Sequence, residues 1–150
     1  IELAVAEHHQ LFGGDAHSDF LRSLRAAALS AMELLVMFSP RLVGPVLSGT
    51  ADHNSAINLH LFADSAEAVG LQLSGSGFTF RAFERRLKFR RNESQTFAGF
   101  EFHFAEATIQ ATVFPVDGIR QAPLSPIDAR PMQRADVRAV ELLLTPAASP

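Results

Sequence analysis

The chain has 150 residues, of which 47% are apolar and 19% are charged, and its formal net charge is −3. This composition excludes a disordered chain and is typical of one globular domain with a hydrophobic core. The negative charge argues against a protein that binds nucleic acid over its whole surface. The absence of Cys excludes disulfides, thiolate catalysis and Cys-ligated zinc, and it favours a reducing, cytoplasmic location. No apolar run is long enough to span a membrane, so no membrane partner is expected.

Hydrophobic periodicity and turn residues divide the chain into helices and strands. In chain order, the pattern predicts helices over 1–12 and 18–37, strands over 42–47 and 56–62, a helix over 64–73, strands over 78–83, 85–91, 97–104 and 107–114, and a helix over 133–144. Four prolines predict a long ordered loop before the last helix: Pro115, Pro123, Pro126 and Pro131.

These elements predict a single domain over residues 1–150. Its parts are N-terminal helices at 1–38, a sheet core at 42–114, and a C-terminal loop and helix at 115–150. The order is two helices, two strands, a helix, four strands and a helix, from which we expect an α+β fold. Its helices should pack on one side of a mixed or antiparallel sheet.

The segment Leu47–Phe62 carries the most information about function. It places a Gly49-Thr50 turn between two predicted strands, the second of which alternates strictly between apolar and polar residues. Alternate residues of a strand face the same side, so Asn58 and His60 should share a face.

This segment resembles the DNA polymerase β-type nucleotidyltransferase superfamily, including small bacterial proteins of that superfamily. In the family, a hydrophobic residue and Gly-Gly or Gly-Ser precede a loop and an Asp-hydrophobic-Asp/Glu strand. Here Gly49-Thr50 and Ala56-Ile57-Asn58-Leu59 stand at those places. A later strand of the family supplies a third carboxylate, for which Ile109-Gln110-Ala111 is the best match. The resemblance covers about residues 42–114 and implies a nucleotidyltransferase-like fold.

The resemblance also implies that the catalytic carboxylates are missing. It assigns their three positions to Ala56, Asn58 and Gln110, and the loop between Thr50 and Ala56 is shorter than the family usually has. Nucleotidyl transfer uses Mg²⁺ held by carboxylates and substrate phosphates. Asn and Gln offer only neutral oxygens and Ala offers none. We therefore expect a pseudoenzyme with no catalytic residues, no metal site and no cofactor.

The function expected of such a chain is binding, of a nucleotide, a small anion or a protein partner. The predicted ligand-binding residues lie in the turn and on the polar strand face: Ser48, Gly49, Thr50, Asn58, His60 and Gln110. Together with Thr112, the strand residues could equally form a polar patch satisfied within a half-exposed sheet.

Two other functions stay open. The first is an active, Mg²⁺-dependent nucleotidyltransferase with relocated acids, for which Asp52, Asp64, Glu101 and Glu106 are the candidates. The second is an unrelated α+β interaction or dimerisation module, in which the Phe-rich strands form an intersubunit sheet.

A basic cluster at 81–91 holds six of the 13 basic residues. Arg86, Lys88 and Arg90 project together from an extended strand and could bind phosphate or an acidic partner. Phe89 alternates to the other side, so the cluster lacks the stacking rings that nucleic-acid binding favours. A solvated or edge-protecting strand is the favoured interpretation.

A further candidate site is a cluster that contains His and Asp side chains. His60, Asp52, His53 and His103 are residue types that bind metals or transfer protons. Their spacing does not bring them together, so the pattern favours a solvated turn at Asp52-His53 and a surface position for His103.

Overall fold

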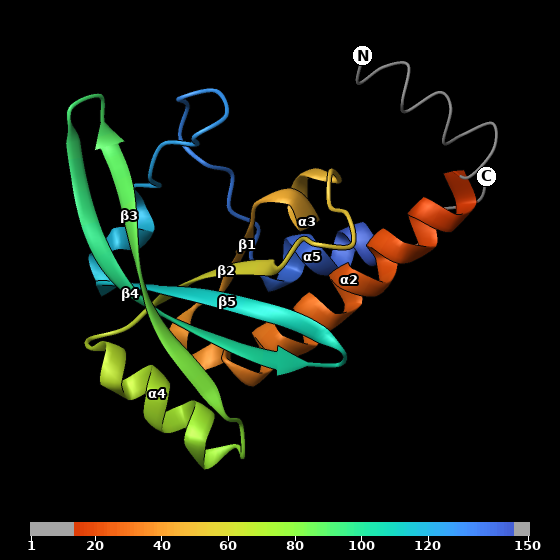
Figure 1. The fold of residues 1–150 in the computed structure, drawn as a ribbon, viewed down its shortest axis with the longest axis horizontal. Coiled ribbons are helices and arrows are strands. Elements are labelled where there is room, and N and C mark those ends of the chain that lie inside the picture. Colours follow the sequence, from red (N-terminus) through yellow and green to blue (C-terminus); the bar gives the residue numbers. More distant parts are fainter. Residues whose placement is uncertain (1–13, 146–150) are drawn as a thin grey trace.

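The computed structural model describes residues 14–145 and is an α+β domain built on one five-stranded mixed sheet (Figure 1). The predicted fold class is confirmed. The elements are α2 (Gly14–Leu34), η2 (Val36–Phe38), β1 (Arg41–Val43), α3 (Pro45–Ser48), β2 (Ile57–Phe62), α4 (Ala66–Gly75), β3 (Phe80–Arg90), β4 (Glu93–Phe104), β5 (Ala107–Phe114), η3 (Val116–Arg120) and α5 (Val137–Leu144). The helix predicted over 1–12 lies outside the described residues.

The strand order is β1-β2-β5-β4-β3, and only β2 and β5 run parallel. In that parallel pair Asn58 lies beside Gln110 at one end, and Phe62 lies beside Phe114 at the other. A parallel pair needs a crossover connection. Here α4, β3 and β4 form it, and residues about 50 positions apart in sequence become neighbours.

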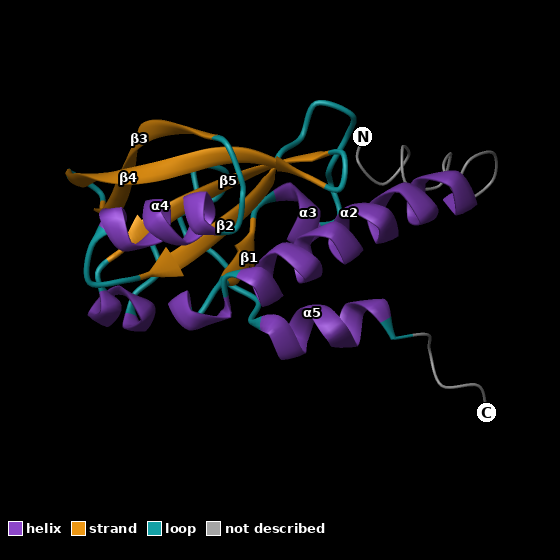
Figure 2. Ribbon diagram, turned by 90° about the horizontal axis from the view of Figure 1, so that it is seen from below, coloured by secondary structure: helices purple, strands orange, loops and turns teal. Residues whose placement is uncertain are grey.

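One face of the sheet is apolar and packs against helices. Ile57, Leu59 and Ile109 are fully buried on this face, as the alternation of β2 predicted. They form a single buried cluster with apolar residues of α2 and α4. Figure 2 shows α2 as a long helix with α5 running beside it. Burial of this face is the main stabilising contribution expected for a domain of this size.

The long loop after β5 is ordered by contacts with the sheet, as the sequence predicted. Leu124 N donates to Lys88 O at 2.7 Å, which ties the loop to β3. Ala135 and Leu42 exchange two backbone hydrogen bonds of 2.7 and 2.9 Å beside β1. The loop thereby reaches both edge strands of the sheet.

Several predicted boundaries were wrong for local reasons. The strand expected over 42–47 ends at Val43, because Gly44 adopts φ +77° and Pro45 begins α3, where a Pro at the first helical position is favoured. The two strands expected over 78–91 are one strand, β3. The last helix begins at Val137 rather than 133, because the Asp136 side chain caps it by accepting from Ala139 N at 2.9 Å.

Candidate functional site

A chain of hydrogen bonds crosses the polar face of the sheet and joins four strands. Arg85 of β3 donates from Nη2 to Gln110 Oε1 at 2.8 Å, and from Nη1 to Asn58 Oδ1 at a longer 3.4 Å. Gln110 donates onward to Glu101 Oε1 at 2.9 Å. The prediction that Asn58 and Gln110 share one face is confirmed by their pairing in the β2–β5 ladder.

Arg85 is half-buried at the centre of this network. Its guanidinium lies 5.0 Å from the ring centroid of Phe83, and burial lowers the pKa of Arg85 below its usual value. An arginine remains charged under such a shift. Both side-chain acceptors are neutral amides, and Arg85 makes no ion pair within 4 Å with any residue of 14–145. Its positive charge therefore has no paired carboxylate.

The carboxylate in the network belongs to Glu101, and it is paired with Arg81. Arg81 Nη2 and Glu101 Oε2 lie 3.0 Å apart. The hydrogen bond from Gln110, and after it the one from Arg81, lowers the pKa of Glu101. The Glu101 anion is thus held between an amide and a second arginine.

The positions that the resemblance assigns to metal-binding carboxylates are therefore organised around a cation. Ala56 precedes β2 and contributes only its carbonyl, 3.5 Å from Asn58 Nδ2. Sequence reasoning missed the role of Arg85, which it counted only as part of a basic cluster. Strand parity places Arg85 on the face opposite to Arg86. Only the β3–β4–β5 register shows that this face is the one that holds Gln110.

The predicted ligand-binding turn is the end of the short helix α3. Gly49 adopts φ +92° as its C-cap, and the amides of Gly49 and Thr50 both donate to Pro45 O, at 2.9 and 3.0 Å. These amides thus already have an acceptor within the chain. The exposed polar groups of the turn are the hydroxyls of Ser48 and Thr50, which lie 2.9 Å apart.

His60 lies on the predicted face but is closed off from ligands. It is 3% exposed, and Arg134 Nε donates to His60 Nδ1 at 3.0 Å. Burial, followed by the charges of Arg134 and Arg85, lowers the pKa of His60 to about 3, so the ring is neutral at pH 7. The neighbouring Thr112 is fully buried. The accessible part of this face therefore lies around Asn58, Gln110 and Arg85.

The predicted basic patch is divided between two faces. Arg86 and Lys88 are exposed, and Arg86 Nε donates to Ser94 Oγ at 2.9 Å. Between Lys88 and Arg90 the β3–β4 register shifts, and Arg90 lines a hollow on the face that also carries Phe89. The expectation that Arg90 projects with Arg86 and Lys88 was wrong, because a β-bulge redirects the side chains that follow it.

The candidate relocated acids do not gather into a cluster. Asp52 sits in a turn, where it accepts from Asn54 N at 2.9 Å, and Glu101 belongs to the network on β4. No group of three or more acidic or His side chains in residues 14–145 has an arrangement that could hold a metal ion. In the same part of the chain, every helix is too short or too polar to cross a bilayer.

Comparisons of the chain with protein-family models, with curated proteins and with solved structures gave no match.

Proposed function

We propose that this chain is a non-catalytic domain of nucleotidyltransferase-like fold that binds an anionic ligand on the polar face of its sheet. The ligand is a nucleotide or another phosphate-bearing compound. Arg85 binds the anion, and Asn58 and Gln110 orient the Arg85 side chain. The expected protein partner and the Mg²⁺-dependent enzyme have no comparable support from side-chain geometry.

The observation that carries the proposal is the charge state of the network. Arg85 is half-buried, yet both of its acceptors are neutral and no carboxylate pairs with it. A partly desolvated cation without a counter-charge favours a negatively charged partner. A planar guanidinium also matches the paired oxygens of phosphate.

The replacement of carboxylates by amides supports binding rather than catalysis. Asn58 and Gln110 turn their oxygens toward the guanidinium, an arrangement that would attract no Mg²⁺ beside a fixed positive charge. A bound phosphate would therefore meet Arg85 directly, without a bridging metal ion.

Calorimetric titration with ATP and with inorganic triphosphate, in EDTA, tests the proposal. We expect saturable binding without divalent metal, and Arg85→Met should weaken it by about tenfold, the typical effect of losing a charge-assisted hydrogen bond. Arg91→Met is the matched control, because Arg91 is an exposed cation in the β3–β4 turn. Equal binding by the two variants, or turnover of ATP that requires Mg²⁺, would contradict the proposal.

A further inference from the structure

A hollow separate from the Arg85 network lies between the β3–β4 hairpin and η3. It is an open hollow of about 260 Å³. Phe114 and Pro115 line it where β5 ends, and Gly118 and Gln121 line it from η3 and the residue after it. The ends of parallel strands are frequent ligand sites in sheets with crossover connections. We call this site the aromatic hollow.

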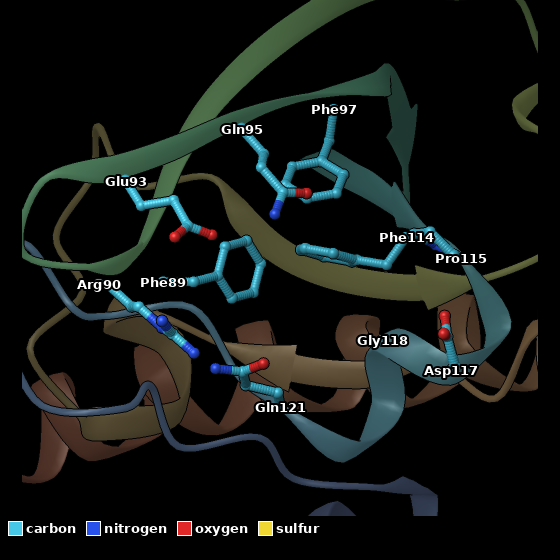
Figure 3. A pocket seen from close by; sticks show the side chains of 10 residues that line it. All are labelled: Phe89, Arg90, Glu93, Gln95, Phe97, Phe114, Pro115, Asp117, Gly118 and Gln121. Atoms are coloured by element: carbon cyan, nitrogen blue, oxygen red, sulfur yellow. The ribbon is translucent and has the colours of Figure 1, made fainter.

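Three phenyl rings wall the aromatic hollow. Figure 3 shows Phe89, Phe97 and Phe114 bordering the same open space from three strands. The ring centroids of Phe97 and Phe114 are 4.6 Å apart with planes at 45°, and those of Phe89 and Phe97 are 5.8 Å apart with planes at 64°. Phe114 is only 1% exposed and closes the inner side of the hollow, whereas Phe89 and Phe97 are half-buried. A planar aromatic guest can therefore contact Phe89 and Phe97 in the preferred offset and edge-on geometries.

The rim of the aromatic hollow is polar, and its side chains have no partner within the described chain. Residues 14–145 provide no side-chain hydrogen bond or ion pair to any of the five: Arg90, Glu93, Gln95, Asp117 and Gln121. In Figure 3, Gln95 points into the hollow from the strand side, and Asp117 and Gln121 rise from the η3 side. The hollow thus combines aromatic rings with several free polar groups, and polar groups that converge on a cavity fix the orientation of a small molecule.

The charge and size of the aromatic hollow restrict the ligand. The rim carries two carboxylates, Glu93 and Asp117, and one guanidinium, Arg90, so its net charge is negative. It therefore favours a ligand with hydrogen-bond donors and disfavours an anion. The volume of about 260 Å³ lies just below the usual range for ligand pockets and suits no more than one or two fused rings.

We propose that the aromatic hollow binds a small, uncharged, planar heteroaromatic compound that carries amino groups on its edge. Its ring stacks on the half-buried rings of Phe89 and Phe97, and its N–H groups donate to Asp117 and to the amide oxygen of Gln121. This site is independent of the anion site. Along β2 and β5, the end marked by Phe62 and Phe114 is four residues, roughly 13 Å, from the end that holds Asn58 and Gln110.

The test uses the fluorescence of 2-aminopurine, free base, titrated with the whole chain at neutral pH. The chain contains neither Trp nor Tyr, so the emission at the band of the probe comes from the probe alone. Stacking on Phe rings quenches that emission, and we expect saturable quenching that adenine competes away. Benzoate, a planar anion without N–H groups, should not compete.

Three variants and two exposed controls decide the result. Phe97→Leu, which keeps an apolar wall but removes the ring, should weaken binding about fivefold. Asp117→Asn and Gln121→Ala are both exposed and outside the sheet. Each should weaken binding about fivefold, the first because a charge-assisted hydrogen bond becomes a neutral one and the second because an acceptor is removed. Asp64→Asn and Gln133→Ala are exposed controls away from the hollow and should bind as the unchanged chain does.

Quenching that does not saturate, or that is the same in the rim variants and the controls, would overturn the proposal. Arg85→Met separates the two proposed sites. It should leave 2-aminopurine binding unchanged and weaken triphosphate binding, so each proposal can fail while the other stands. Circular dichroism of every variant establishes that it is folded, and Asp117→Asn keeps the test valid if Phe97→Leu does not fold.

Discussion

The two faces of the sheet are built from the same strands but are stabilised by different interactions. On β2, Leu59 faces the helices and is fully buried, whereas the adjacent Asn58 faces the opposite side and takes part in a hydrogen-bond network. On β5, Ile109 and Gln110 divide in the same way. The helix-covered face is held by non-directional apolar burial, and the polar face depends on particular donor and acceptor atoms.

Because of this difference, we expect substitutions on the two faces to have different effects. An apolar face can exchange residues of similar volume and keep the fold. We expect the polar face to contribute less to stability, and in the proposed function it carries the charge that a ligand recognises. We therefore expect substitutions on the helix-covered face to change stability, and those on the polar face to change binding.

The largest expected effect is on the free energy of unfolding, for substitutions of two adjacent residues of β2. Leu59→Ala should lower the free energy of unfolding by about 2–5 kcal/mol, because it leaves a cavity in the fully buried cluster. Asn58→Ala should lower it by about 1 kcal/mol or less, because it removes only long hydrogen bonds of 3.4 and 3.5 Å. Urea denaturation of both variants measures the difference. An equal loss of stability would mean that the polar network, and not the apolar cluster, holds the sheet together.

The next effect concerns His60, the one buried titratable residue of the polar face. Its pKa is lowered to about 3 in the folded chain, while the unfolded chain has the ordinary value of about 6.5. The unfolded state therefore binds the extra proton first as the pH falls. The contribution of His60 to stability is complete above about pH 6.5 and is lost at about 1.4 kcal/mol per pH unit below it, until about pH 3.

Urea denaturation at pH 7 and pH 5 measures this dependence. We expect the unchanged chain to lose about 2 kcal/mol between these values through His60. In His60→Gln, which keeps an acceptor for Arg134 but does not titrate, that part of the loss should disappear. His103→Gln is the control, since His103 is exposed on β4. If His60→Gln keeps the full pH dependence, His60 is not the neutral acceptor of Arg134.

The sequence predicted the helix-covered face well, because alternation is a local signal. The period of two in β2 assigned Ile57 and Leu59 to the core and Asn58 to the other side, and the structure agrees. It also placed Gln110 beside Asn58, although that inference rested on a resemblance.

The parts that could not be predicted depend on contacts between distant residues. Arg85 meets Gln110 only because β4 lies between β3 and β5, and Arg134 meets His60 across 74 positions of sequence. The aromatic hollow needs both the bulge after Lys88 and the turn of the chain into η3. The pattern of residues along one strand does not determine its register with the neighbouring strand. These contacts can therefore be predicted only when the pairing of the strands is known.

The smallest expected effect is on the pKa of Glu101, and it shows which contact holds this carboxylate on the polar face. The side chain of Arg81 is 71% exposed, and exposed ion pairs contribute little because water screens them. The hydrogen bond from Gln110 is the larger cause of the lowered pKa of Glu101. Arg81→Met should therefore leave the thermal midpoint unchanged and raise the Glu101 pKa, measured by NMR, less than Gln110→Ala does. The opposite order would mean that the ion pair with Arg81, and not the hydrogen bond from Gln110, holds the Glu101 carboxylate in place.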